Sequence, residues 1–245
     1  MRQRLDQMLV ARGLVQSRAR AADLINRGAV AVGGRVAAKA GLLVEADADV
    51  SVDGAANAYV SRSGTKLAAA LAEFGLDASG RNALDIGAST GGFTQVLLEA
   101  GAQRVYAVDI GHDQLHPALR SDSRVASLEG RDARSLTRQD ITEPIDAIVA
   151  DVSFISLKQA LPVPLQLAAP RSWLIALVKP QFEVGRACVG KRGVVNDRAA
   201  IDGAVVDIEE FLAGTGWSVI GTLRSPLPGK EGNVEWLIGA LRHER

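Results

Sequence analysis

The sequence predicts an α/β protein with a mostly parallel sheet, whose last strand runs antiparallel, preceded by a small α+β module. From Asn82 onward, short apolar runs alternate with helical patterns, which is typical of a doubly wound parallel sheet. A glycine-rich loop follows the first of these runs. Residues 1–39 hold eight basic and two acidic residues, a net charge of +6 in a chain whose total is zero. A basic module on an otherwise acidic chain indicates contact with a polyanion.

The composition is that of an ordinary globular protein, with 47% hydrophobic residues. Its single cysteine, Cys188, excludes an internal disulfide and fits a reducing compartment. No apolar run approaches the roughly 18 residues of a membrane span, and the N-terminus lacks the apolar stretch of a signal peptide. We therefore expect a cytoplasmic protein without membrane contact.

The first module is expected to consist of two helices followed by short strands. Apolar spacing predicts a helix over residues 4–12, stopped by Gly13, and Ser17 is a plausible N-cap for a second helix. Strands are expected at 29–32, 35–36 and 50–52. We place this module at 1–57, a linker rich in small and polar residues at 58–62, and the larger domain at 63–245.

The larger domain begins with an apolar helix from Leu67 to Phe74 and then alternates. Strands are predicted at 83–86, 104–109, 124–128, 145–150, 172–178, 217–223 and 234–239. Helices are predicted at about 92–100, 113–120, 157–168 and 198–213. Two late strands after one helix suggest an antiparallel return at the end of the sheet.

The glycine-rich loop after the first strand of this domain predicts a nucleotide-type cofactor site. Glycines let the backbone approach a ligand, and the N–H groups of the next helix point at it. The spacing G-x-x-x-G-G differs from the dinucleotide fingerprint G-x-G-x-x-G, and the G-K-[ST] ending of a P-loop is missing. The candidate loop residues are Asp85, Gly87, Ala88, Ser89, Gly91, Gly92 and Phe93.

Acidic residues at strand ends narrow the identity of the cofactor. Asp109, followed by Ile110, ends the second strand, where a carboxylate can accept both hydroxyls of a ribose. Asp85 favours S-adenosyl-L-methionine, because that cofactor carries an ammonium group whereas the pyrophosphate of NAD would be repelled. Asp132 follows the third strand and is either a partner of the adenine amino group or a turn residue.

Two further strand ends carry candidate reactive groups. Asp151 follows the fourth strand, at the edge where such sheets perform their chemistry. Lys179 closes the next strand and is followed by Pro180, an unusual placement for a merely solvated charge. No cluster of residues suggests a metal site.

The basic residues of the first module form a candidate RNA-binding surface, together with a charged loop further on. Such a cluster can grip phosphates without reading bases. The candidates are Arg4, Arg18, Arg20, Arg27, Arg35, Lys191 and Arg192. A solvated charged surface is the alternative for each of them.

Two resemblances join these observations. Residues including Arg4-Leu5-Asp6, Ser17-Arg18, Leu24-Ile25 and Gly28 resemble the small RNA-binding module named after ribosomal protein S-four. Nearly the whole chain resembles the TlyA-type ribosomal RNA 2′-O-methyltransferases, whose catalytic domain is similar to that of FtsJ-type enzymes. The matching runs include Leu84 to Thr94, Asp151 to Ser156, Lys179 to Glu183, Lys191 to Val195 and Gly232 to Glu235. Ser63 departs from the family, which usually has glycine there.

The resemblance implies a Rossmann-like methyltransferase sheet and a Lys–Asp–Lys–Glu tetrad, carried here by Lys66, Asp151, Lys179 and Glu235. It also implies methyl transfer from S-adenosyl-L-methionine to a ribose 2′-oxygen, of cytidine by family analogy, in ribosomal RNA or ribosomal subunits. Lys179 would be the base or would stabilise the developing alkoxide. Glu183 competes with Glu235 for the acidic role. No stable protein partner is expected.

Three other functions compete with this one. The family is often labelled hemolysin, which would make the protein membrane-lytic, but no stretch combines a wide apolar face with a basic one. A non-catalytic RNA-binding protein would not need all four tetrad positions filled. An NAD-dependent dehydrogenase is disfavoured by the spacing of the glycines.

Overall fold

The computed structural model describes residues 2–15, 17–26, 28–54 and 58–242. The chain divides into two compact units, Met1–Arg62 and Ser63–Arg245. Residues 58–62, expected to form the linker, fall in the first of these units.

The first unit packs two helices against short strands. Its elements are β1 (Arg2–Arg4), α1 (Leu5–Ala11), α2 (Arg18–Asn26), β2 (Val30–Val32), β3 (Arg35–Val36), β4 (Leu43–Glu45) and β5 (Val50–Val52). A three-stranded sheet has the order β3-β2-β5, and β1 pairs with β4 separately. The apolar faces of both helices supply a core that includes Leu5, Met8, Leu9, Leu24 and Ile25. The helices and three of the strands lie where the sequence predicted them, whereas β1 and β4 were not predicted.

The second unit is the expected α/β domain. Its elements are α3 (Ser63–Phe74), β6 (Asn82–Ile86), α4 (Gly92–Glu99), β7 (Arg104–Asp109), α5 (Pro117–Arg120), β8 (Val125–Glu129), η1 (Ala133–Ser135), β9 (Ile145–Ala150), α6 (Leu157–Ala160), α7 (Pro162–Leu167), β10 (Ala168–Val178), α8 (Pro180–Glu183), η2 (Arg186–Cys188), α9 (Arg198–Gly214), β11 (Trp217–Arg224) and β12 (Trp236–Arg242).

Its seven strands form one sheet in the order β11-β12-β10-β9-β6-β7-β8. The pairs from β10 to β8 are parallel, while β12 runs antiparallel to both of its neighbours, β10 and β11. The mostly parallel sheet with an antiparallel last strand is therefore confirmed. The strand order reverses beside β6, since β7 lies on one side of it and β9 on the other, and ligands of such sheets bind outside the carboxyl ends at that point.

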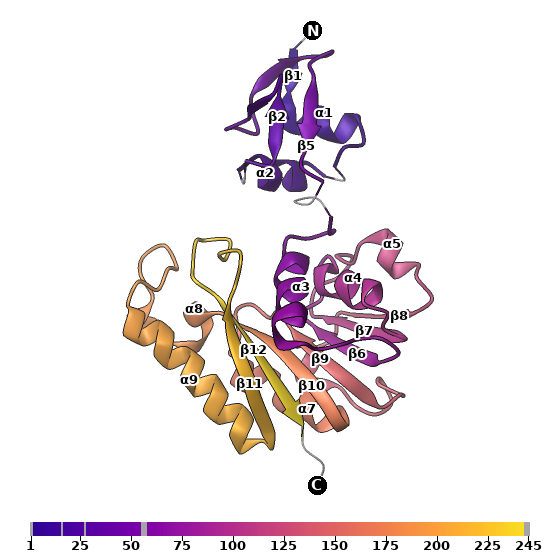
Figure 1. The fold of residues 1–245 in the computed structure, drawn as a ribbon, viewed down its shortest axis with the longest axis vertical. Helices are drawn as coiled ribbons and strands as arrows, with labels where there is room; N and C mark the ends of the chain where they lie inside the picture. Colours follow the sequence, from indigo (N-terminus) through magenta and orange to yellow (C-terminus); the bar gives the residue numbers. More distant parts are fainter. Residues whose placement is uncertain (1, 16, 27, 55–57, 243–245) are drawn as a thin grey trace. The chain divides into compact units, whose positions relative to one another are not determined.

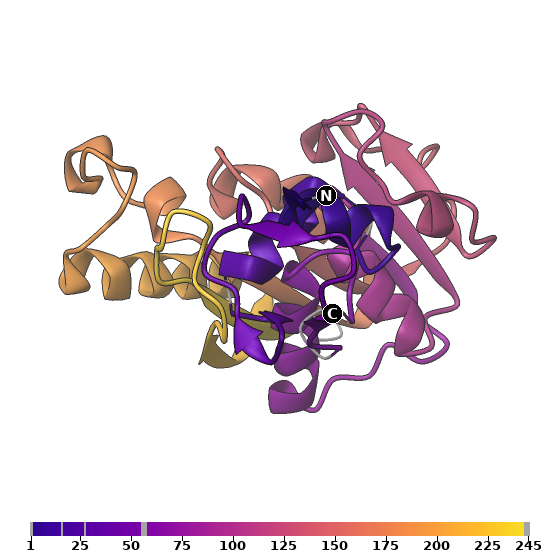
Figure 2. The same cartoon turned by 90° about the horizontal axis from the view of Figure 1, so that it is seen from above.

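Helices cover both faces of this sheet (Figure 1). On one face α4 packs on β6 and β7, and α3 packs on α4, β11 and β12, whereas α7 and α9 pack on the opposite face. Both views place α9 at the β11 end of the sheet, with β7 and β8 at the opposite end (Figure 2). The core is made of strand residues such as Leu84, Ile148 and Leu174 with Ile208 and Leu212 of α9.

Several predicted elements differ in extent, among them the strand expected at 172–178, which begins at Ala168. The helix expected over 113–120 is reduced to the four residues of α5, which begins at Pro117. The helix expected over 157–168 is divided into α6 and α7, because Pro162 and Pro164 have no N–H to donate within a continuous helix. The last strand begins at Trp236 instead of residue 234.

Candidate active site

The loop between β6 and α4 brings bare backbone to the edge of the sheet. Gly87 has φ of 81°, and a Cβ atom built on it would lie 2.6 Å from the carbonyl oxygen of Asp151. Gly91, with φ of 95°, would meet the side chain of Leu119 at 2.3 Å. Both positions therefore require glycine for space as well as for backbone conformation. The loop can pass close to the end of β9 and to a ligand.

Asp85 lies beneath this loop and is fully buried. Thr94 donates its hydroxyl hydrogen bond to Asp85 Oδ2 at 2.6 Å, while Asp85 Oδ1 has no hydrogen-bond partner. Burial raises the pKa of Asp85 to about 7, against the opposing effect of the Thr94 hydrogen bond and with a smaller contribution from Asp151. Asp85 is not among the side chains that line the pocket described below, so its link to a bound cofactor stays a prediction.

Asp109 holds the other side of the glycine loop. Its carboxylate accepts hydrogen bonds from the backbone N–H of Ser89 at 2.8 Å and of Gly111 at 2.7 Å. Each carboxylate oxygen keeps a second lone pair, so two ribose hydroxyls could still donate to it. Ile110, next in the chain, is 71% exposed at the mouth of the same region.

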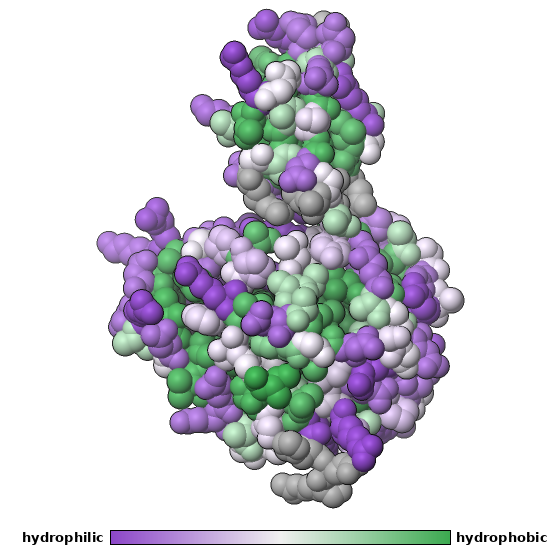
Figure 3. Space-filling view, in the orientation of Figure 1, coloured by the Kyte–Doolittle hydropathy of each residue, from purple (hydrophilic) through white to green (hydrophobic). Residues whose placement is uncertain are grey.

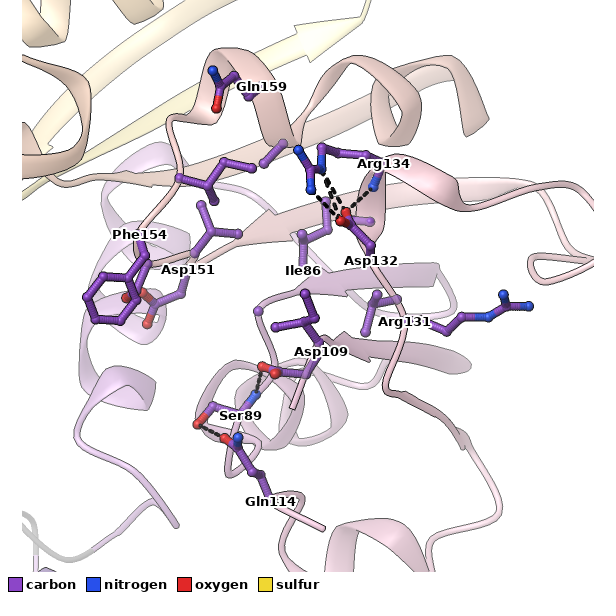
Figure 4. A pocket seen from close by; sticks show the side chains of 18 residues that line it. Ile86, Ser89, Asp109, Gln114, Arg131, Asp132, Arg134, Asp151, Phe154 and Gln159 are labelled. Atoms are coloured by element: carbon purple, nitrogen blue, oxygen red, sulfur yellow. Dashed lines mark hydrogen bonds and ion pairs between the residues drawn. The ribbon is translucent and has the colours of Figure 1, made fainter. Parts of the chain in front are cut away.

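A pocket of about 660 Å³ opens between this loop and the ends of β7, β8 and β9 (Figure 4). Its lining includes Ile86, Gly87, Ser89, Asp109, Asp132 and Asp151. Asp132 caps η1 through the N–H of Arg134 and also forms an ion pair with the Arg134 guanidinium. The hydrogen bonds from the Arg134 guanidinium and backbone N–H hold the pKa of Asp132 below its usual range, against the opposing effect of burial. Asp132 thus acts as a turn residue at the start of η1. Its contact with the adenine amino group stays a prediction.

The exposed backbone at Gly87 and the acidic side chains of the pocket wall, Asp109, Asp132 and Asp151, fit S-adenosyl-L-methionine. Glycine at 87 and 91 leaves room for the neighbouring residues Asp151 and Leu119, and Gly87 itself lines the pocket. Among the described residues, no group of His, Cys, Asp and Glu could hold a metal ion.

Sheet register brings three of the four tetrad residues to one edge. Ala176 of β10 is paired with Ala150 of β9, so Asp151 follows at the end of the neighbouring strand. Val178 is paired with Trp236 of β12, which places Lys179 and Glu235 opposite each other one residue further on. The fold thus assembles groups that are far apart in the sequence.

Lys66 joins this edge from α3 through an ion pair with Glu235. Both side chains are buried, with 5% and 3% of their side-chain surface exposed. Gly229 leaves room for the carboxylate, since a Cβ atom there would lie 2.5 Å from Glu235 Oε1. Removing either partner of a buried ion pair would leave an uncompensated charge in the interior. The pair therefore holds Glu235, the residue directly before β12, against α3.

Lys179 contacts two acceptors, Asp151 Oδ1 at 2.7 Å and Ser153 Oγ at 2.8 Å. A charged ammonium group would keep one N–H for a third partner, whereas a neutral amine would keep its lone pair. Both roles considered for Lys179, stabilising an alkoxide or accepting a proton, are compatible with this arrangement.

Glu183 is engaged elsewhere. It accepts hydrogen bonds from the hydroxyl of Ser156 and, at 2.8 Å, from the N–H of Leu157. It therefore holds the start of α6 and the end of the loop that begins at Asp151. Burial raises the pKa of Glu183.

Sequence reasoning missed three residues of the site: Thr94, Ser153 and Phe154. Phe154 is 92% exposed, has φ of 66° and lies with its ring 5.3 Å from that of Phe182. A large apolar side chain that is exposed and has a left-handed backbone conformation is uncommon. All three lie in the motif runs quoted for the family resemblance, but only the structure shows their contacts.

The predicted RNA-binding residues differ in accessibility. Arg4 and Arg18 are exposed and share the buried carboxylate of Asp6. Arg20 has only 10% of its side chain exposed, pairs with Asp23 and donates to the carbonyl of Tyr59, so it already has partners within the module, and its contact with RNA stays a prediction. Arg35, Lys191 and Arg192 are exposed, and Arg27 lies outside the described residues.

Family models account for both units. Residues 59–242 match the FtsJ-like methyltransferase family, and residues 3–50 match the S4 domain. The chain therefore belongs to the FtsJ-like methyltransferases and carries an S4 domain. It is a methyltransferase with S-adenosyl-L-methionine as its cofactor, which excludes the dehydrogenase alternative.

Relatives are similar to nearly the whole length of this chain. The chain is 44% identical to the 16S/23S rRNA (cytidine-2′-O)-methyltransferase TlyA of Mycobacterium tuberculosis, over 97% of this chain and 89% of the relative. It is 38% identical to Hemolysin A of Brachyspira hyodysenteriae, over 96% of this chain and 98% of that protein. A solved structure of a hemolysin-named protein from Streptococcus thermophilus is also similar, with a TM-score of 0.79 and 37% sequence identity. The match covers 99% of this chain and 89% of the chain in that structure. In the part of the chain that the structure describes, no helix has the length and apolar character needed to cross a membrane.

Proposed function

We propose that the protein methylates the 2′-oxygen of a cytidine ribose in ribosomal RNA. This proposal rests mainly on one observation. Two ion pairs, Lys179–Asp151 and Lys66–Glu235, lie at the same edge of the sheet, beside the pocket. Similarity to the M. tuberculosis relative, which is named for this reaction, supports the substrate class. A protein that methylates ribosomal RNA would act in the cytoplasm.

The reaction needs an aligned electrophile and the removal of one proton from a weak acid. S-adenosyl-L-methionine supplies the methyl group as an electrophilic carbon. Asp109 and the glycine loop would hold this cofactor, and the four tetrad residues would orient the ribose, so that much of the rate enhancement comes from alignment. Lys179 would receive the 2′-hydroxyl proton, or balance the negative charge that develops on the oxygen.

Phe154 offers a surface for the target nucleotide. Its exposed ring lies at the pocket, one residue after Ser153 and three after Asp151. Proteins that bind unpaired RNA bases stack them on aromatic side chains. Stacking on Phe154 would bring a ribose to the Lys179 side of the pocket.

Mapping of methylated nucleosides in ribosomal RNA tests the function directly. Cells that lack the protein should lose one or more 2′-O-methylcytidines, and purified protein with S-adenosyl-L-methionine should restore them. Ribosomal RNA with an unchanged methylation pattern in both experiments would contradict the proposal.

Variants of Lys179 test the chemistry. Lys179→Ala should lower methyl transfer at least about a hundredfold, because general acid–base groups contribute that much or more, while cofactor affinity stays close to normal. Lys179→Arg keeps the positive charge but cannot accept the proton, so residual activity in that variant would assign charge stabilisation to Lys179. Near-normal turnover of Lys179→Ala, measured by transfer of a labelled methyl group, would exclude both roles.

A further inference from the structure

The first unit contains one acidic side chain in an unexpected place for a nucleic-acid-binding module. Asp6 is only 3% exposed and lies at the start of α1, between two of the arginines predicted to contact RNA. A buried carboxylate beneath a basic surface lowers the net charge of that surface, so its presence needs a reason.

Asp6 makes hydrogen bonds to both arginines. Arg4 donates from Nε to Oδ1 and from Nη2 to Oδ2, each at 3.0 Å. Arg18 donates to Oδ2 from Nη2 at 3.2 Å and from Nε at 3.4 Å. The N–H of Gln7 donates to Oδ1 at 3.0 Å, which fixes the carboxylate itself. These contacts hold the pKa of Asp6 below its usual range, so it remains charged.

The two guanidinium groups are therefore neighbours. The Nη2 atoms of Arg4 and Arg18 both donate to the same oxygen, Asp6 Oδ2, at 3.0 Å and 3.2 Å. The distance between the two nitrogen atoms therefore cannot exceed the sum of these two hydrogen-bond distances. Two like charges at that separation repel each other unless an anion lies between them, and Asp6 supplies this anion from below.

Both guanidinium groups also keep an accessible side. The side chain of Arg4 is 44% exposed and that of Arg18 is 59% exposed. Each has N–H groups that Asp6 does not use, because a guanidinium has five. Gly41 confines Arg4 from another direction, since a Cβ atom there would lie 3.1 Å from Arg4 Nη1. Hydrophilic side chains gather on the end of the first unit where β1 lies (Figure 3).

We propose that Asp6 is a positioning residue, which holds Arg4 and Arg18 side by side as a clamp for one phosphate group of the RNA backbone. Guanidinium forks match phosphate oxygens in geometry, and side chains fixed in advance lose less entropy on binding. The inference rests on the proposed function, in that the phosphate belongs to the ribosomal RNA substrate. In this proposal Asp6, although negatively charged, strengthens the binding of negatively charged RNA.

Binding of purified ribosomal RNA to the full chain, measured at several salt concentrations, tests the clamp. Arg4→Lys and Arg18→Lys keep the charge but lose the fork, and each should weaken binding roughly three- to tenfold. Asp6→Asn should also weaken binding although it makes the module more positive. The matched control is Glu45→Gln, which removes an exposed carboxylate paired with Arg2 and should leave affinity equal or higher.

A double-mutant comparison separates positioning from a merely structural role. In a protein that already carries Arg4→Gln and Arg18→Gln, the change Asp6→Asn should have no further effect on RNA affinity. An equal loss in both backgrounds, or lysine variants that bind RNA as the unaltered protein does, would overturn the proposal. If Asp6→Asn lowers the melting temperature so far that the module unfolds, the exposed lysine variants decide the question.

Failure of the clamp and failure of the proposed function give different results. Without the clamp, the lysine variants would bind ribosomal RNA normally while the unaltered protein still methylated it. Without the proposed function, the unaltered protein would transfer no methyl group to ribosomal RNA at any concentration.

Discussion

Asp85 is the residue whose ionisation is most altered by the fold. Its folded-state pKa of about 7 lies above the ordinary value of 3.8, so the folded protein holds a proton that the unfolded chain has released. This contribution to stability is complete below about pH 4 and is lost as the pH rises through 7. We expect Asp85→Asn, which keeps the Thr94 contact without a charge, to flatten this part of the stability profile of the cofactor-free protein. Urea unfolding from pH 5 to 8 measures it, and parallel profiles for the two proteins would contradict the assignment.

Glu183, which is partly buried, and Glu235, which is buried, are acids with different expected functions. Glu183 accepts hydrogen bonds from Ser156 and Leu157, a role that a glutamine oxygen can take over. Glu183→Gln should therefore keep methyl transfer within about threefold, since one acceptor replaces another.

Glu235→Gln should behave differently, because it leaves Lys66 as an unpaired buried charge. Loss of one partner of a buried pair costs about 3–5 kcal/mol, so both the free energy of unfolding and activity should fall. Denaturant unfolding and methyl-transfer rates of the two glutamine variants provide the comparison. Equal inactivation of both would place Glu183 in the chemistry.

At the scale of elements, the loop at Gly190–Gly193 presents Lys191 and Arg192 to solvent. Asn233, almost fully buried, connects this loop to the turn before β12, through hydrogen bonds to the N–H of Val195 at 2.9 Å and the carbonyl of Gly193 at 2.8 Å. The exposed charges are thus fixed near the turn that ends at Glu235.

Replacing Lys191 and Arg192 together with alanine should weaken binding of ribosomal RNA and lower its salt dependence. The slope of log affinity against log salt should fall by about one to two, as expected for one or two lost phosphate contacts. Cofactor affinity should not change. An unaltered slope would identify these residues as solvated surface charges.

The sequence predicted the elements well where their own residues determine them. Strands 104–109 and 145–150 have the predicted bounds because most of their residues are apolar and buried, as expected of a parallel strand covered on both faces. β1 and β4 could not be predicted, since they pair with each other, far apart in the sequence, and lack the valine-rich pattern that indicated β2 and β5. For the site, motif positions indicated Lys66, Asp151, Lys179 and Glu235, but their contacts depend on strand register, which has no local signal in the sequence.

At the scale of the whole molecule, charge is less segregated than the first 39 residues suggested. The first unit also contains Glu45, Asp47, Asp49 and Asp53, so with Arg62 its nine basic and six acidic residues give a net charge of +3. The proposed RNA binding by this unit would therefore depend more on where its arginines are held than on its overall charge.

Removal of residues 1–57 tests the division of labour between the units. The second unit has its own core and the whole glycine loop, so it should fold and bind S-adenosyl-L-methionine like the full chain. Its methyl transfer to ribosomal RNA at low RNA concentration should fall at least about tenfold, because the module that binds phosphates is missing. Calorimetry and initial rates check the two expectations. Full activity at low RNA concentration would show that the second unit recognises the RNA alone.

The position of β12 has a consequence for synthesis of the protein. β12 is the last of the seven strands to be made, yet it lies between β10 and β11 and is preceded directly by Glu235. Until it is available, β10 and β11 have no partner on that side, and Lys66 has no counterion. Formation of the complete sheet and of the Lys66–Glu235 ion pair therefore depends on a segment that is made after all the other strands.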